Sequence, residues 1–263
     1  MPLTIAKAHA FGNDFLFVPR EQVSGDAEAV ARALCNRHHG AGADGLILYT
    51  LAPQKATMKL LNADGSPSEL SGNGLRCLAA LVARTQALPV GAIVTADTDA
   101  GVKTLELLSV DGERYTFRAA LGPPEDIRQV QIPVLGQTLV ASVLRMGNPQ
   151  CVVLGPLPDA DAFHRLGPAL ATHTMFPAGT NVEFAHVEAP DRVRIVIWER
   201  GVGPTLASGT GASASGVAAA AHGGAARSLD VIAPGGTQRV EWRADGVYLT
   251  GWAELVFEGH FLR

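Results

Sequence analysis

At 263 residues, the chain is long enough for one large domain or two modest ones, since a domain averages about 150 residues. A composition of 47% hydrophobic and 17% charged residues, with 29 glycines and 16 prolines, is typical of a globular protein and excludes disordered and collagen-like chains. The net charge of -4 provides no basic field to neutralise phosphates, so no nucleic-acid partner is expected.

The first half is predicted to combine several strands with two helices. The strands are expected at Leu16–Val18, Leu46–Leu51, Met58–Leu61, Ile93–Ala96, Val102–Val110 and Arg114–Ala120. Asp111-Gly112, between the last two, is a strong hairpin turn signal. The helices are expected at Ala27–Asn36 and Gly72–Gln86, and Pro89 ends the second.

The second half follows a similar plan after Leu121-Gly122-Pro123-Pro124, the predicted domain junction. Its strands are expected at Ser142–Arg145, Cys151–Leu154, Val182–Val187 and Arg192–Trp198. One helix is predicted from Gly209 to about Ala221, ending at Gly223-Gly224. This helix has almost no polar face, so it should be buried on all sides.

Two glycine-rich segments recur at one fixed distance, which indicates a duplicated chain. Ala41-Gly42-Ala43-Asp44 aligns with Ala178-Gly179-Thr180-Asn181, and Ser71-Gly72-Asn73-Gly74 aligns with Ser208-Gly209-Thr210-Gly211, both at a shift of 137 residues. Gly12-Asn13 aligns with Gly147-Asn148 at a shift of 135. The prediction is an α/β (α+β) protein of two pseudo-symmetric domains, each a mostly antiparallel curled sheet around a central helix. The domains are expected at 1–120, completed by the C-terminal strand 251–263, and at 121–250.

The three cysteines, Cys35, Cys77 and Cys151, lack the paired spacing of a disulfide framework or zinc site, which predicts a reducing cytoplasm and no metal. They are assigned to the core. The N-terminal segment lacks the apolar stretch of a signal peptide, and no run of about 18 apolar residues follows, so neither export nor membrane insertion is expected.

Three familiar motifs are excluded by their context. Gly40 to Gly45 fits the dinucleotide fingerprint G-x-G-x-x-G, but a predicted helix precedes it and a strand follows, the reverse of the required order. Neither Ser71 nor Ser208 lies in a G-x-S-x-G nucleophile elbow. The eight histidines include no H-E-x-x-H pair or other metal-ligand spacing.

The most informative segments are the glycine-rich starts of two predicted helices. Ser71 and Ser208 occupy the N-cap positions, and the glycines after them would let a ligand approach free backbone N–H groups closely. Simple helix capping would explain one such motif, but two copies related by duplication predict an anion-binding site. If the halves face each other, both N-termini can hold one carboxylate, with a serine on either side of the carbon that bears it.

Uncharged amides and one charged pair accompany these helix starts. The amides are Asn13, Asn62, Asn148 and Asn181, and the pair is Glu199 and Arg200. Arg200 could clamp a carboxylate with two hydrogen bonds, and Glu199 could receive an ammonium group. These groups are suited to recognising a zwitterion, although a surface ion pair would also account for the last two.

The same segments make the chain resemble the diaminopimelate epimerase family over essentially its whole length. They are Lys7 to Phe15, Gly40 to Gly45, Asn62 to Ser66, Ser71 to Arg76, Gly147-Asn148-Pro149, Gly179 to Val182 and Trp198 to Gly211. The resemblance implies two pseudo-symmetric domains, no cofactor, and interconversion of LL- and meso-diaminopimelate in lysine and cell-wall synthesis. It also implies substrate contacts from Asn13, Asn62, Gly72, Asn73, Asn148, Asn181, Glu199, Arg200, Gly209 and Thr210. A homodimer is the expected assembly if the chain associates.

The sequence departs from the family pattern at its catalytic positions. The family has cysteines, a thiolate base and a thiol acid, where this chain has Ser71 and Ser208. A thiol has a pKa near 8.5, lowered further at a helix N-terminus, whereas a hydroxyl needs a neighbouring base. The family's histidine after Gly-Asn-Pro, which tunes the cysteines together with the glutamate at Glu199, is Gln150 here.

Three explanations of these departures stay open on the sequence alone. The chain can be a double Cys→Ser form made to hold substrate without turnover. It can be a natural variant acting slowly on diaminopimelate or on another amino acid, an explanation that Gln150 favours. It can also be a non-catalytic amino-acid-binding homologue.

Overall fold

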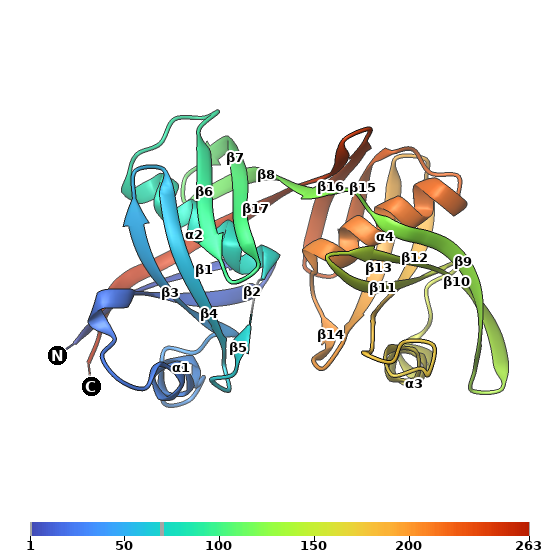
Figure 1. The fold of residues 1–263 in the computed structure, drawn as a ribbon, viewed down its shortest axis with the longest axis horizontal. Helices are drawn as coiled ribbons and strands as arrows, with labels where there is room; N and C mark the ends of the chain where they lie inside the picture. The colour runs from blue at the N-terminus through green and yellow to red at the C-terminus, as the bar shows by residue number, and fades with distance from the viewer. Residues whose placement is uncertain (1, 69–70, 263) are drawn as a thin grey trace. The chain divides into compact units, whose positions relative to one another are not determined.

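The computed structural model describes residues 2–68 and 71–262. The chain separates into two compact units, unit 1 with Met1–Ala119 and Gly251–Arg263, and unit 2 with Ala120–Thr250. In each unit a mostly antiparallel sheet packs around one central helix, which confirms the predicted fold class (Figure 1). No described helix is both long and apolar enough to cross a membrane.

Unit 1 is built around helix α2. Its elements are β1 (Leu3–Ala10), β2 (Asn13–Pro19), the 3-10 helix η1 (Arg20–Gln22), α1 (Ala27–Cys35), β3 (Gly45–Ala52), β4 (Lys55–Asn62), β5 (Pro67–Ser68), α2 (Gly72–Thr85), β6 (Ile93–Thr98), β7 (Gly101–Asp111) and most of β8 (Arg114–Gly122). Strand β1 pairs antiparallel with β2 and with β17 (Gly246–Phe261), and β2 pairs parallel with β3. One face of this sheet packs on α1, where Leu16, Leu46 and Leu48 are buried with Leu34.

Unit 2 is built in the same way around helix α4. Its elements are β9 (Glu125–Val134), β10 (Gln137–Met146), β11 (Asn148–Leu154), α3 (Ala160–Ala171), β12 (Asn181–Ala189), β13 (Arg192–Glu199), β14 (Gly203–Thr205), α4 (Gly209–His222), β15 (Ser228–Ala233), β16 (Gly236–Arg243) and the start of β17. Strand β11 pairs parallel with β12, as β2 does with β3. Every residue of α4 from Gly211 to Ala219 is buried, as its missing polar face predicted.

The order of elements repeats between the units. Strands β1 and β2, then α1, strands β3 to β5, α2, and strands β6 to β8 correspond to β10 and β11, α3, β12 to β14, α4, and β15 to β17. In unit 2 the face of β11 and β12 opposite α4 buries Cys151, Val182 and Phe184 with α3, as the α1 face does in unit 1. Cys35, Cys77 and Cys151 are free and buried, as expected.

Several elements differ from the sequence-based expectations. The segment Leu121-Gly122-Pro123-Pro124, predicted as the domain junction, contains the end of β8 at Gly122 and the two prolines that precede β9 at Glu125. No helix or strand was predicted at the positions of β1, η1, β5, β9, α3, β14, β15 and β16. Helix α3 contains Gly167 and Pro168, which normally interrupt a helix. Gly167 is required there, because a Cβ on it would lie 2.7 Å from the Trp198 ring.

Candidate active site

Helix α2 starts with the serine that the sequence singled out. Ser71 is its N-cap, and the Ser71 Oγ accepts a hydrogen bond of 3.1 Å from the Gly74 N–H. Next to it, a Cβ on Gly72 would meet no atom of residues 2–68 or 71–262 within 4 Å. Gly74, in contrast, is tightly packed, because its Cβ would lie 3.1 Å from Ile47 Cδ1. A small anion can therefore approach the first turn of α2 over Gly72.

We expect Gly72→Ala to separate folding from binding. Because the space at Gly72 is open and its φ is not positive, alanine should keep or raise the unfolding free energy by about 0.4–1 kcal/mol. The added methyl group should obstruct an anion at the helix start and weaken its binding. Thermal denaturation with and without LL-diaminopimelate measures both effects. A variant that is stabilised by the ligand as much as the parent chain would show that the ligand does not approach over Gly72.

A chain of hydrogen bonds orients the amides beside the first turn of α2. The buried Asn73 donates to Asn13 Oδ1 at 3.3 Å, and Asn13 Nδ2 donates to Asp44 Oδ2 at 2.7 Å. Arg76, which is 3% exposed, donates to Asn73 Oδ1 at 3.1 Å. The structure thus brings Asn13 and Asn73 together, whereas Asn62 is bonded to Ser66 Oγ at 2.9 Å.

A cluster of charged side chains holds the carboxylate to which this amide chain is bonded. The Asp14 carboxylate, which is 8% exposed, lies 2.8 Å from Lys7 Nζ and 2.8 Å from Arg37 Nη2. Arg37 also bonds Asp44 at 2.7 Å, which fixes the carboxylate that holds Asn13. Burial raises the pKa of Asp14, but the hydrogen bonds and charges of Arg37 and Lys7 outweigh that effect and hold it below its ordinary value of 3.8.

This lowered pKa predicts an acid-sensitive stability term. Because Asp14 binds protons more weakly in the folded chain, its contribution is complete above pH 3.8 and is lost as the pH falls through the lower folded pKa. Asp14→Asn should lower the melting temperature at neutral pH and flatten its decline in acid. Melting curves between pH 2 and pH 7 test this, with the exposed Asp26 as the control position. Parallel pH profiles for the parent chain and Asp14→Asn would contradict the assignment.

Helix α4 starts in the same way but has a carboxylate beside its serine. The Ser208 Oγ accepts 3.2 Å from the Gly211 N–H and lies 3.5 Å from Thr210 Oγ1. Glu199 accepts hydrogen bonds from the hydroxyls of Thr205, at 3.2 Å, and Ser208. Burial raises the pKa of Glu199, and these two hydrogen bonds offset part of the rise. Ser208 therefore has a neighbouring base, which a serine needs for proton transfer.

The other predicted residues of unit 2 lie at the ends of neighbouring strands. Asn181 is the register partner of Gln150, and its Oδ1 accepts 2.9 Å from the Arg200 backbone N–H. The buried Gln150 donates to Asn148 Oδ1 at 2.5 Å. Glu199 and Arg200 do not pair with each other among the described residues, because their side chains have different partners.

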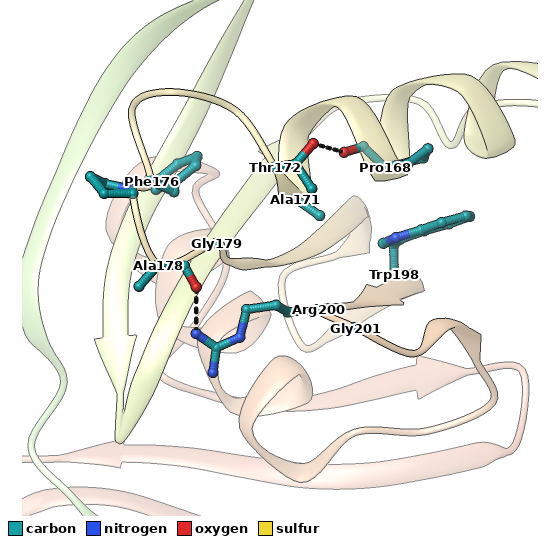
Figure 2. Close-up of a pocket in the computed structure, with 10 residues that line it drawn as sticks. Pro168, Ala171, Thr172, Phe176, Ala178, Gly179, Trp198, Arg200 and Gly201 are labelled. Atoms are coloured by element: carbon teal, nitrogen blue, oxygen red, sulfur yellow. Dashed lines mark hydrogen bonds between the residues drawn. The ribbon is translucent and has the colours of Figure 1, made fainter.

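Arg200 lines a cavity of about 350 Å³ beside the end of α3 (Figure 2). Its Nη1 donates to the Ala178 carbonyl at 2.7 Å, and its Cδ lies 2.8 Å from where a Cβ on Gly179 would be. Gly179 also has φ +73°, so this close approach requires glycine. Phe176 and Trp198 form apolar parts of the wall. The guanidinium thus lies at a cavity large enough for part of a small molecule.

Sequence reasoning missed two residues of this region. Thr205 binds Glu199, and the only hint was its place just before the glycine-rich segment. Glu183 is fully buried, and a Cβ on Gly211 would lie 2.6 Å from its Oε1. A glutamate between Val182 and Phe184, inside a run of buried residues, was the signal available for it.

Solved structures similar to this chain share its fold at low sequence identity. A PhzF-family phenazine biosynthesis protein from Bacillus anthracis has a TM-score of 0.73 at 14% identity, and each chain is covered completely. A hydroxyproline epimerase from Agrobacterium vitis has a TM-score of 0.70 at 17% identity, over 99% of this chain and 92% of that one. The architecture is therefore the one that these proteins share.

Sequence relatives define the family more narrowly. Diaminopimelate epimerases from Desulforudis audaxviator and Desulfitobacterium hafniense are each 40% identical to this chain. Each match covers 99% of this chain, and the two matches cover 100% and 98% of the relatives, respectively. The profile of the diaminopimelate epimerase family matches residues 5–125 and 142–256. The chain belongs to the diaminopimelate epimerase family, as its motifs predicted.

Proposed function

We propose that this chain is a cofactor-independent amino-acid epimerase that interconverts LL- and meso-2,6-diaminopimelate. Its family membership supports the reaction, and its relatives carry the name diaminopimelate epimerase. The observation that carries the proposal is the repeated helix start, in which Ser71 and Ser208 cap α2 and α4 next to glycines. The product would serve lysine and cell-wall synthesis, as the family resemblance implies.

In the proposed mechanism, the helix starts hold the substrate carboxylate next to the reacting carbon. Backbone N–H groups at Gly72, Asn73, Gly209 and Thr210 are proposed to stabilise negative charge as it spreads into that carboxylate. Asn62, Asn148, Asn181 and Arg200 are proposed to bind the rest of the substrate. Glu199 is proposed to attract its ammonium group.

The proton step at Ser208 uses Glu199. The Cα–H bond of the substrate breaks, its proton passes to Ser208 Oγ, and the Ser208 hydroxyl proton passes to the Glu199 carboxylate. The electron pair stays on Cα and spreads into the substrate carboxylate. Ser71 then donates its hydroxyl proton to the opposite face of Cα, which inverts the centre. Water reprotonates the Ser71 alkoxide, and the hydroxide so formed takes up the proton that Glu199 releases, so both groups are restored before the next turnover. The hydrogen bond between Ser208 and Glu199 supports this relay.

Ser71 has a different environment from Ser208. Among the interactions of residues 2–68 and 71–262, the Ser71 Oγ accepts from the Gly74 N–H, and no carboxylate is bonded to it. Within the part of the chain that the structure describes, the helix start is the group that would stabilise its alkoxide. We therefore propose that removal of the substrate proton is faster on the Ser208 side than on the Ser71 side, and that the serine pair makes a slow enzyme.

Proton NMR of LL-diaminopimelate in D₂O tests the proposed function. Loss of the α-proton signal with the parent chain, and its retention with Ser71→Ala/Ser208→Ala, would support epimerase chemistry by the two serines. Thermal stabilisation by the ligand without any exchange would instead indicate a binding protein. Repeating the experiment with shorter amino acids identifies a different substrate.

We also propose the cytoplasm as the compartment, since the three cysteines are free thiols and no disulfide is formed by them. The net charge of -4 gives no support for a nucleic-acid partner. A homodimer is the assembly to test by light scattering, because twofold dimers are the commonest oligomers.

A further inference from the structure

Glu183 is a buried carboxyl group that the proposed reaction does not use. It lies near the start of β12, on the strand face toward α4, and is 0% exposed. Neither of its carboxyl oxygens has a hydrogen-bond partner among the described residues. Its Oε1 and the Ser208 Oγ lie 2.6 Å and 3.2 Å from a single point, the place of a Cβ on Gly211. Glu183 is therefore packed against the first turn of α4, beside the serine.

The fold does not need a carboxyl group at this position. Gly74 in α2 corresponds to Gly211 in α4 under the sequence repeat, and the residue packed over Gly74 is Ile47, whose Cδ1 lies 3.1 Å from the place of a Cβ. Unit 1 thus forms the same packing with an apolar side chain, and Ile47 is fully buried. A glutamate at the equivalent place costs desolvation free energy without a compensating hydrogen bond. We therefore expect Glu183 to have a functional role, since it does not stabilise the fold.

One other carboxyl group faces Glu183 from the elements packed around it. Glu183 is the register partner of Ile197 on β13, so Glu199, two residues further along the same strand face, is its charged neighbour. Burial, together with the Glu199 charge, raises the pKa of Glu183 well above its ordinary value. The neighbouring face of β11 carries the uncharged Gln150 and Val152, and the Cys151 thiol is buried on the opposite face with α3. In α4 the titratable residue is His222, at the far end of the helix.

The two carboxyl groups differ in the hydrogen bonds that they accept. Glu199 receives hydrogen bonds from Thr205 and Ser208, which stabilise its ionised form, whereas Glu183 receives none. Of two neighbouring carboxyl groups, one buried and one half-buried, the ionisation of either disfavours the ionisation of the other. The charge should therefore reside on Glu199 and the proton on Glu183.

We propose that Glu183 is a positioning residue that holds the single proton of the Glu183–Glu199 pair as a neutral acid, so that the negative charge of the pair stays on Glu199, the base beside Ser208. The inference deepens the proposed function, because it assigns the source of the base that the Ser208 step requires. In that step no proton leaves Glu183. The pair carries one negative charge before proton transfer from Ser208 to Glu199 and none after it.

Carbon-13 NMR of glutamate carboxyl groups tests whether Glu183 carries the proton of the pair, and it does not require turnover. The Glu183 signal is identified by its absence from Glu183→Gln. We expect it to show a protonated carboxyl at about pH 7, where ordinary glutamates are ionised. In Glu199→Gln its titration midpoint should fall by about one pH unit or more, the coupling at which two groups titrate as a pair. An ionised Glu183 at neutral pH, or a midpoint unchanged in Glu199→Gln, would overturn the proposal.

The pH profile of α-hydrogen exchange tests the consequence for the reaction. Exchange by the parent chain should fall at alkaline pH as Glu183 loses its proton. Glu183→Gln and Glu183→Ile should lack this fall. Isoleucine is the matched packing control, because Ile47 packs over Gly74 in unit 1 as Glu183 packs over Gly211 in unit 2. Profiles that superimpose on the parent would reduce Glu183 to a structural residue. If neither the parent chain nor any variant exchanges the α-hydrogen, the proposed function fails. The NMR titration still decides whether Glu183 carries the proton of the Glu183–Glu199 pair.

Discussion

The variant Ser71→Cys/Ser208→Cys is expected to exchange the α-hydrogen of LL-diaminopimelate about 10²-fold or more faster than the parent chain. Both positions cap a helix, where the dipole favours a negative charge, so a thiol there should ionise below its ordinary pKa of about 8.5. A serine hydroxyl ionises far less readily and depends on Glu199 at one position. Initial rates of proton NMR signal loss in D₂O measure the gain.

The controls for this experiment lie on the same helices. Each single variant should be slower than the double variant, since inversion needs an acid on one face and a base on the other. Ser213→Cys places a buried thiol elsewhere in α4 and should leave the rate unchanged. If the double variant is no faster than the parent, the caps are structural and the acid and base lie elsewhere.

Arg200→Ala is expected to weaken the binding of diaminopimelate by about 10-fold or more, the loss expected when hydrogen bonds between a guanidinium and a carboxylate are removed at an exposed residue. The guanidinium lies at the cavity beside α3 and is held by the Ala178 carbonyl, so it is placed to bind a second carboxylate (Figure 2). An amino acid with one carboxylate has no group for it and should bind equally to both chains. Isothermal titration with both ligands separates the two cases.

Arg200→Lys provides the matched control for charge. A lysine keeps the positive charge but cannot form two parallel hydrogen bonds, so it should recover part of the affinity. Unchanged affinity in Arg200→Ala would mean that Arg200 contributes only to the cavity wall, and would favour a shorter amino acid as substrate.

The central helices were predictable because their sequences carry several consistent signals. Helix α4 was expected from its glycine-rich start, its apolar faces and its terminal glycines, and it begins at Gly209 as predicted. Helix α3 was missed because Gly167 and Pro168 oppose a helix locally, while packing on Trp198 favours it. The repeat itself would have revealed α3, since α1 precedes the corresponding strands in the first half. Strand β1 was missed because its alanines give a weak strand signal.

The candidate site was predictable where residue type alone carried the signal. The N-caps were confirmed, and the chemistry of Glu199 follows from its hydroxyl partners. Which partner each side chain takes could not be read from the sequence. Glu199 and Arg200 are neighbours in the chain, yet one turns to Ser208 and the other to Ala178. The roles of all these residues in catalysis stay predictions until the exchange experiments are done.

The division of the chain also constrains how it folds during synthesis. Unit 2 is one continuous stretch, Ala120–Thr250, and its strands can pair as soon as that stretch has left the ribosome. Unit 1 needs residues from both sides of it, because β1 pairs with the last part of β17. Until β17 emerges, the hydrogen-bonding edge of β1 has no partner strand on that side, which makes it a template for association between nascent chains. Strand β1 is therefore synthesised well before the strand that completes its pairing, and a chaperone that protects β1 in the interval would raise the yield of folded protein.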